Sequence, residues 1–310
     1  MRILVTGGAG YLGSVLCPML LEAGHDVTVV DDLLYRQESL LHVAAHPRFT
    51  FVRGDVRDRP LMSGVLTGHD VIVPLAAIVG APACDRHPDL ARGVNLEAVR
   101  LLMELKSRDQ RVVFATTNSG YGIGEREALC TEESPLRPVS LYGVTKVQAE
   151  EAVRERGNAA VLRLATVFGV SPRMRTDLLV NDFVIRAMMD RSIVLFEEHF
   201  RRNFIHIRDV GRTILWALEH WDTMCDQVYN VGLSSANLSK RELCERIKTY
   251  CPTLVVFSSS VGEDPDKRDY IVSNAKLEAT GWRPALSLDD GIRELINAMP
   301  LLRLQPHSNL

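Results

Sequence analysis

A tyrosine and a lysine that could take part in proton transfer lie four residues apart, in Tyr142-Gly-Val-Thr-Lys146. Positions i and i+4 of a helix share one face, so the phenol and the ammonium can act at one site. Tyrosine has an ordinary pKa of about 10, and a neighbouring cation favours its phenolate form. The alternative interpretation of this spacing is a solvated helix face.

Thr117 ends an earlier apolar run, in Thr116-Thr117-Asn118-Ser119, and its hydroxyl could share a proton with Tyr142. For any single threonine the alternative is an ordinary strand residue. What strengthens the functional interpretation is position, because Thr117 and Tyr142 fall on either side of one predicted strand-to-helix connection.

A second candidate site is the segment Gly7-Gly8-Ala9-Gly10-Tyr11-Leu12-Gly13, which follows an apolar run at 2–6. Glycines let the backbone turn tightly and approach a pyrophosphate, and the N-terminus of the following helix supplies free N–H groups. Two acids follow the next apolar run at the spacing of a ribose-binding carboxylate, which favours NAD over NADP. The predicted cofactor residues here are Gly7, Gly10, Tyr11, Leu12, Gly13, Asp31 and Asp32.

The segment Gly54-Asp55-Val56 ends the third apolar run. Asp55 and Val56 could face the adenine of the same cofactor. A helix N-cap is an equally good interpretation of Asp55, because aspartate commonly accepts hydrogen bonds at that position.

The elements that must position these residues alternate regularly in the first half. Near-continuous apolar runs predict buried strands at 2–6, 26–30, 50–52, 70–75, 111–115 and 159–164, and helical patterns fall between them at 11–23, 58–67, 88–106 and 141–157. This alternation predicts an α/β fold with a Rossmann-type doubly wound parallel sheet. Tyr142 then opens the helix after the fifth strand, at the edge where such a sheet has its site.

Beyond about residue 168 the pattern loosens into a smaller α/β region. It predicts strands at 204–207 and 254–257 and helices at 210–221, 239–250 and 288–298. We therefore predict a dinucleotide-binding domain at 1–168, with a returning segment near 201–231, and a second domain at 169–310. No linker separates them, so we expect a shared cleft, where ligands commonly bind.

Composition excludes several classes of function. The 310 residues carry 36 basic and 39 acidic side chains, and a net charge of −3 argues against nucleic-acid binding. No run reaches the roughly 18 apolar residues of a membrane span, and the first residues show no signal-peptide pattern. The six cysteines include no C-x-x-C pair. We expect a cytoplasmic protein without a metal site.

Together, the glycine turn, Asp31, Thr117, Tyr142 and Lys146 resemble the extended short-chain dehydrogenase/reductases, the NAD-dependent epimerase/dehydratase family that acts on nucleotide sugars. The resemblance covers nearly the whole chain: Leu75-Ala76-Ala77 is similar to the loop over the cofactor, and 163–169, with Val167, to the strand and turn beside the nicotinamide. It implies an enzyme with tightly bound NAD or NADH, in which Thr117, Tyr142 and Lys146 carry the proton transfer.

The resemblance also implies a nucleotide-diphosphate sugar as the partner. Basic residues gather in the second half at Arg173, Arg175, Arg201, Arg202, Arg208, Lys267 and Arg268, and arginine forks suit phosphate charges. Surface ion pairs are the alternative for any one of them. The predicted substrate residues are Asn118, Ser119, Arg173, Arg175, Asn181, Arg202 and Arg268.

Departures from the family narrow the chemistry. In sugar 4,6-dehydratases an acidic pair or a Ser-Glu pair follows the threonine, and its glutamate takes the C5 proton; here Asn118 and Ser119 stand there. The 3,5-epimerising members have a cysteine where Ser119 stands. We therefore expect oxidation of one carbinol carbon, C4 of the sugar, with NAD.

Several long loops, at 117–124, 171–183, 196–204, 232–238 and 262–274, resemble those of enzymes that oxidise GDP-D-glycero-α-D-manno-heptose at C4 in bacterial capsular polysaccharide biosynthesis. A nucleotide-sugar 4-epimerase with the same catalytic residues is the alternative. A dinucleotide-binding regulator without catalysis is a more distant one, because such proteins usually lack the Tyr/Lys pair.

Related enzymes pair through two helices of each copy, here those at 88–106 and 141–157, which implies a dimer or a tetramer. Leucines at 101, 102 and 105 and a valine at 147 suit such a surface. An ordinary buried core face explains the same residues about as well.

Overall fold

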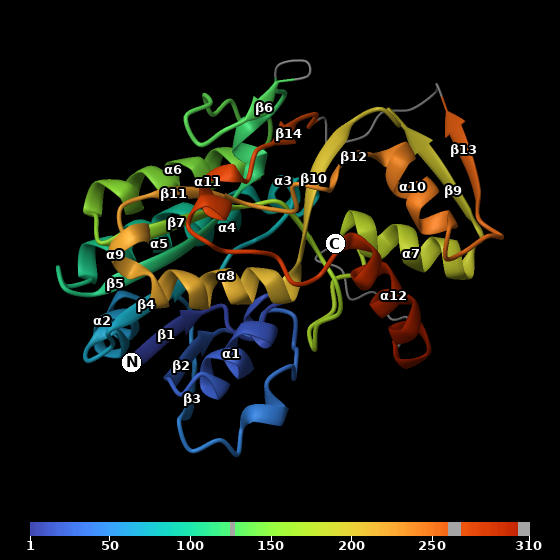
Figure 1. Cartoon of the computed structure of the whole chain (residues 1–310). Helices are drawn as coiled ribbons and strands as arrows, with labels where there is room; N and C mark the ends of the chain where they lie inside the picture. Colours follow the sequence, from blue (N-terminus) through green and yellow to red (C-terminus); the bar gives the residue numbers. More distant parts are fainter. Residues whose placement is uncertain (125–127, 260–267, 303–310) are drawn as a thin grey trace.

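The fold is known from a computed structural model that describes residues 1–124, 128–259 and 268–302. Its main sheet has seven strands in the order β11-β7-β5-β4-β1-β2-β3, and every neighbouring pair is parallel (Figure 1). The strands are β1 (Arg2–Thr6), β2 (Asp26–Asp31), β3 (Phe49–Arg53), β4 (Val71–Pro74), β5 (Arg111–Thr117), β7 (Ala159–Leu164) and β11 (Val228–Val231). The predicted doubly wound parallel sheet is confirmed.

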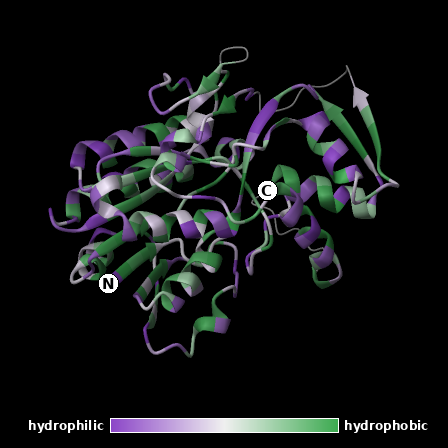
Figure 2. Cartoon of the chain, viewed as in Figure 1, coloured by the Kyte–Doolittle hydropathy of each residue, from purple (hydrophilic) through white to green (hydrophobic). Residues whose placement is uncertain are grey.

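Helices cover both faces of this sheet because successive residues of a strand point to opposite sides. Ile3 and Val5 of β1 belong to one hydrophobic cluster, while Leu4 between them belongs to another. The first cluster includes residues of α1 (Gly13–Glu22) and α8 (Ile207–Glu219), and the second includes residues of α2 (Arg59–Leu66), α5 (Ala98–Leu105) and α6 (Leu141–Arg156). The strands at the centre of the sheet are predominantly hydrophobic, as Figure 2 shows.

The single helix predicted at 88–106 is wrong in detail. The chain forms α3 (Ala81–Arg86), α4 (Pro88–Arg92), a wider helical turn at Gly93–Glu97, and α5. Asn95 in that wider turn is buried, and its amide accepts from the Ile78 N–H at 2.8 Å and donates to the Ile78 carbonyl at 3.0 Å. A contact with a residue 17 positions earlier therefore accompanies the irregular turn.

Three small sheets lie beside the main one, and most of their strands belong to the second region. They comprise β8 (Thr166–Phe168) with β10 (Arg201–His206) and β12 (Asn237–Ser239), β9 (Ser192–Phe196) with β13 (Val255–Ser259), and β6 (Leu129–Cys130) with β14 (Ile271–Val272). The helices of the second region are α7 (Leu179–Met189), α10 (Lys240–Lys248), α11 (Ala275–Ala279) and α12 (Leu288–Ala298); α9 (Trp221–Met224) follows α8. The sequence predicted β13 and α12 but missed β8, α7 and β9.

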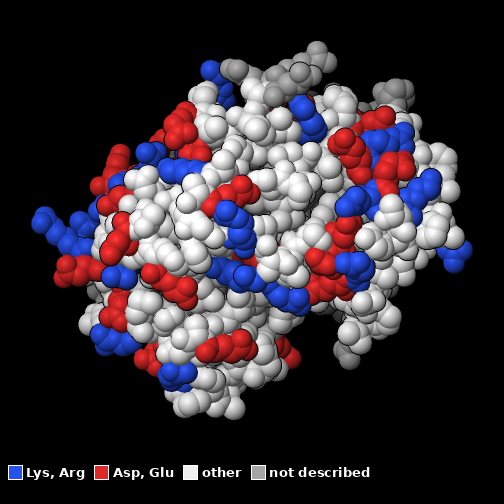
Figure 3. Space-filling view, viewed as in Figure 1, with Lys and Arg blue, Asp and Glu red and all other residues white. Residues whose placement is uncertain are grey.

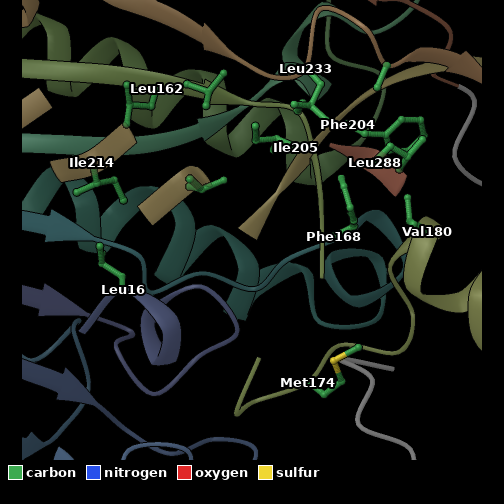
Figure 4. Close-up of a cluster of buried hydrophobic side chains, with 14 of the residues drawn as sticks. Leu16, Leu162, Phe168, Met174, Val180, Phe204, Ile205, Ile214, Leu233 and Leu288 are labelled. Carbon is green, nitrogen blue, oxygen red and sulfur yellow. The ribbon is translucent and has the colours of Figure 1, made fainter. Parts of the chain in front are cut away.

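One continuous hydrophobic cluster joins the two regions. It includes Leu162 of β7, Ile214 of α8, Phe204 of β10, Val180 of α7 and Leu288 of α12, and Figure 4 shows these side chains following one another through the interior. The second region is therefore packed directly on the main sheet, so residues from both can line one cavity.

A capping box begins the predicted helix α10 and gives a stability prediction. The Ser239 hydroxyl accepts from the Glu242 N–H at 3.2 Å, and the Glu242 carboxylate accepts from the Ser239 N–H at 2.7 Å. We expect Ser239→Ala to lower the free energy of unfolding by about 1 kcal/mol. Urea unfolding measures the loss, and the exposed Ser63→Ala should change it by less than about 0.5 kcal/mol. Equal midpoints for the two variants would contradict this role.

Candidate active site

A cavity of about 320 Å³ lies at the carboxyl ends of the central strands. Sixteen residues predicted as catalytic or cofactor-binding line it: Gly7, Gly10, Tyr11, Leu12, Gly13, Asp31, Asp32, Asp55, Val56, Leu75, Ala76, Ala77, Thr117, Tyr142, Lys146 and Val167. Four predicted substrate residues line it as well, namely Ser119, Arg173, Arg175 and Arg268. The fold thus brings residues from distant parts of the sequence around one space.

The glycine turn between β1 and α1 has no room for side chains. Gly7 has φ +69°, and a Cβ on it would lie 2.5 Å from the backbone nitrogen of Ala76; a Cβ on Gly13 would lie 2.5 Å from the Gly8 carbonyl oxygen. The N-cap of α1 is Leu12, which has no side-chain acceptor, and no acid lies in the first turn. The N-terminus of α1 therefore faces the cavity without a competing side chain, which fits the diphosphate of a dinucleotide.

Asp31 ends β2 and is 6% exposed. Its carboxylate accepts from the Leu33 N–H at 2.8 Å and from the Ala9 N–H at 3.0 Å, so it also holds the glycine turn. Burial raises the pKa of Asp31, while these two hydrogen bonds and the charge of Arg173 act to lower it. A buried acceptor at the end of β2 fits an adenosine ribose, as predicted from the sequence.

The helix-cap interpretation of Asp55 is wrong. Asp58 caps α2, and its carboxylate accepts from the Leu61 N–H. Asp55 lines the cavity instead, and its carboxylate is paired with Arg57 at 2.6 Å. The prediction that Asp55 and Val56 contact the adenine fits this position.

Tyr142 and Lys146 lie on the first turns of α6 and both line the cavity, so the solvated-face interpretation is wrong. The Lys146 ammonium is 5% exposed, donates to the Ala115 carbonyl at 2.8 Å and lies 4.3 Å from the centre of the Phe114 ring. Burial lowers the pKa of Lys146 to about 8, while the charge of Glu150, one turn along α6, acts to raise it.

Burial raises the pKa of Tyr142 to about 12. Three groups act against that rise: the charges of Arg268 and Arg175 and a hydrogen bond with Thr117. The Thr117 hydroxyl also donates to the Ser119 hydroxyl at 2.8 Å. The phenol is therefore a poor base by itself and depends on nearby cations to ionise.

The lowered pKa of Lys146 gives a pH prediction. Between about pH 8 and pH 10.5 the unfolded chain binds more protons at this residue than the folded chain does, because the folded-state pKa is about 8 and the ordinary value is 10.5. Lys146 therefore makes the free energy of unfolding rise with pH across that window. In nucleotide-stripped protein we expect Lys146→Met to remove this rise and to be the more stable protein at pH 7.

Urea unfolding at a series of pH values measures this effect as the difference between the wild type and the variant. The matched control is Lys248→Met, because Lys248 is exposed on α10. A pH-dependent difference that is equal for both variants would contradict the buried ammonium.

Residues of the second region complete the Tyr142 end of the cavity. The Arg268 guanidinium donates to the Ser119 hydroxyl, and Arg175 pairs with Asp177 at 2.5 Å. The lining also includes residues that the sequence did not indicate, among them Tyr35, Gln37, Gly80, Ser140, Leu178 and Tyr270. None of them belongs to a motif, and only Ser140, the N-cap of α6, carried a local signal.

Three predicted substrate residues do not line the cavity. Asn118 is fully buried, and neither atom of its amide has a hydrogen-bond partner. Asn181 accepts from the Gly169 N–H at 3.1 Å and donates to the Arg175 carbonyl at 2.8 Å. Arg202 is buried 5.8 Å from the centre of the Tyr270 ring. Their assignment to the substrate stays a prediction.

Of the other three basic residues noted in the second half, two form ion pairs and one lies outside the described residues. Arg201 pairs with Asp269 at 3.7 Å, and Arg208 pairs with Glu294, as the ion-pair alternative proposed. Lys267 lies outside the described residues. On the face drawn in Figure 3, basic and acidic side chains lie interspersed.

No helix in 1–124, 128–259 or 268–302 is long and apolar enough to cross a membrane. Within the same ranges, no group of three or more histidine, cysteine, aspartate or glutamate residues could hold a metal ion.

Known proteins resemble this chain over nearly its whole length. Residues 3–232 match the sequence profile of the NAD dependent epimerase/dehydratase family. An uncharacterized UDP-glucose epimerase of Bacillus subtilis, YtcB, is 32% identical, and the match covers 94% of this chain and 96% of that protein. A dTDP-glucose 4,6-dehydratase of Streptomyces niveus is 30% identical, with 96% of this chain and 92% of that protein covered.

Solved structures show the same architecture. The UDP-glucose 4-epimerase of Thermotoga maritima with UDP-glucose has a TM-score of 0.84 at 25% identity, covering 97% of this chain and 99% of that chain. The NAD complex of the Thermus thermophilus UDP-glucose 4-epimerase has a TM-score of 0.83 at 26% identity, with the same coverage.

Proposed function

Since this chain belongs to the NAD dependent epimerase/dehydratase family, we propose that it oxidises C4 of a nucleotide-diphosphate sugar to a ketone. Its cofactor is NAD, which accepts a hydride when bound. The glycine turn and Asp31 would hold the cofactor, and the second region would hold the sugar nucleotide. The observation that carries the proposal is the meeting of Thr117, Tyr142 and Lys146 at one cavity.

The chain's own residues divide the proton transfer between them. The Tyr142 phenolate oxygen takes the proton of the sugar hydroxyl and becomes the phenol, and the Thr117 hydroxyl aligns the sugar hydroxyl. The Lys146 cation lies on the same face of α6 and favours the phenolate form of Tyr142. Arg175 and Arg268 add positive charge, since both act to lower the pKa of Tyr142.

Elimination of water is disfavoured by the residues that follow Thr117. Ser119 lines the cavity but is bonded to Thr117 and Arg268 and is far too weakly basic to take a C5 proton. Asn118 is buried outside the lining, and an amide is not a base. Among the described residues, the two positions after Thr117 therefore supply no base for the second step of a dehydratase.

We propose GDP-D-glycero-α-D-manno-heptose as the substrate, and a role in capsular polysaccharide synthesis in the cytoplasm, on the resemblance of the long loops. Of these loops, 171–183 supplies Arg173 and Arg175 to the cavity and 262–274 supplies Arg268. The two phosphate charges of the substrate suit the guanidinium groups of Arg175 and Arg268.

A 4-epimerase is the second candidate, because relatives named as UDP-glucose epimerases match nearly the full chain. The two activities use the same proton-transfer residues. A dehydrogenase releases the ketone as its product, whereas an epimerase reduces the ketone again from its other face.

One experiment separates these candidates. The holoenzyme is mixed with the GDP-heptose, and in parallel with UDP-glucose and dTDP-glucose, while NADH absorbance and sugar products are followed. A 4-keto GDP-heptose formed with equimolar NADH is expected. A C4 epimer without net NADH would establish the epimerase, deuterium uptake at C5 with loss of water would establish a dehydratase, and conversion of UDP-glucose alone would overturn the GDP-heptose assignment.

We further propose the division into 1–168 with a return near 201–231 and 169–310, and a dimer paired through α5 and α6. Leu102 is buried in the core, but Leu101, Leu105 and Val147 are only half-buried. Light scattering of the purified protein tests the dimer, and a monomer mass would contradict it.

A further inference from the structure

Residues 169–175, between β8 and α7, are tied to the glycine turn on the other side of the cavity. The Tyr11 hydroxyl donates to the Gly169 carbonyl at 2.7 Å. The Ser171 hydroxyl donates to the Tyr11 carbonyl at 2.7 Å and lies 2.9 Å from the Ser14 hydroxyl. These bonds join a segment of the second region to the N-terminal turn of α1.

Arg173 is placed by these contacts at the cofactor end of the cavity. Its backbone N–H donates to the Ser14 hydroxyl at 3.3 Å, and its guanidinium lies 4.6 Å from the centre of the Tyr35 ring. The residue is 7% exposed and lines the cavity. Tyr35 comes four residues after Asp31, so this guanidinium lies where α1 and the end of β2 meet.

Arg175, only two residues along, has different neighbours. A Cβ on Gly80 would lie 3.9 Å from its guanidinium, and its charge acts on Tyr142. The charge of Arg173 acts on Asp31 and Tyr35, and the charge of Arg175 also acts on Tyr35. The two arginines, which the sequence suggested as a pair for the substrate, therefore line one cavity with different neighbours: Arg173 lies against Tyr35, and Arg175 pairs with Asp177 beside Gly80.

We propose that Arg173 binds the adenosine diphosphate half of the dinucleotide, opposite the N-terminus of α1. A diphosphate between a helix N-terminus and a guanidinium is neutralised from both sides. The Tyr35 ring face supports the guanidinium from behind. The second region thereby contributes a cofactor residue, and cofactor retention depends on a segment outside the strand–turn–helix unit. This inference rests on the NAD assignment but not on the sugar chemistry.

The test measures binding of NADH, ADP-ribose and adenosine to nucleotide-stripped protein by fluorescence and calorimetry. We expect Arg173→Gln to raise the Kd of NADH and ADP-ribose about 10- to 100-fold, as for loss of a charge-assisted hydrogen bond, and that of adenosine less than about 3-fold. The Kd of the sugar nucleotide, measured with saturating NAD, should stay within about 2-fold. The matched control is Arg175→Gln, which should weaken binding of the sugar nucleotide and should raise the Kd of NADH by less than Arg173→Gln does.

Unchanged NADH binding by a folded Arg173→Gln protein, or weaker binding of the sugar nucleotide alone, would overturn the proposal. If that variant does not fold, Tyr35→Leu serves as the test, because Tyr35 is 39% exposed. Loss of this ring should raise the Kd of NADH about 2- to 5-fold. An unchanged Kd of NADH would also overturn the proposal. NADH binding needs no sugar, so failure of this inference and failure of the proposed oxidation give different results.

Discussion

Tyr142→Phe is expected to lower kcat for sugar oxidation by about 10²- to 10⁴-fold, the usual contribution of general acid–base assistance. The variant keeps the aromatic ring that packs beside Ile78 and Cys84 and removes only the hydroxyl. Folding and NAD binding should therefore be preserved.

Single-turnover formation of NADH in the presence of substrate measures the loss. Tyr250→Phe, just after α10 and outside the cavity lining, serves as the control and should retain full activity. Near-normal turnover by Tyr142→Phe would contradict the role of Tyr142 in the proton transfer.

Arg163→Met is expected to destabilise the fold by about 3–5 kcal/mol, because it leaves the carboxylate of Glu150 buried without its partner. The pair is 2.6 Å long, and both side chains are 3% exposed. Arg163 also donates to the Tyr121 hydroxyl and to the Glu132 carbonyl, each at 3.0 Å. This arginine therefore joins β7 to the helix that carries Tyr142 and Lys146.

Urea unfolding of a double-mutant cycle measures the pair. Glu150→Leu combined with Arg163→Met should recover part of the lost stability, because replacing both ions by apolar groups removes the uncompensated charge. The exposed pair of Arg59 and Glu104, with side chains 53% and 61% exposed, is the control, and Arg59→Met should leave the midpoint of urea unfolding nearly unchanged. A loss at Arg163 no larger than that at Arg59 would contradict the buried charge.

Some features were predictable because their signals lie within a few residues. The glycine turn, the capping box at Ser239 and the helix at 288–298 each depend on local backbone geometry or periodicity. By contrast, the wider turn around Asn95 involves Ile78, which is distant in sequence. Periodicity alone therefore predicted one regular helix there.

The sequence by itself determined the α/β class, the cofactor turn and the Tyr142/Lys146 pair, because strand alternation, glycine spacing and helical periodicity are short-range properties. Only the tertiary structure decided which neighbours each arginine has in the cavity. Arg173 follows the bonds of residues 169–175 to α1, and Arg268 reaches Ser119 across 149 residues of sequence. Such placements depend on how the second region packs on the sheet, which no local pattern records.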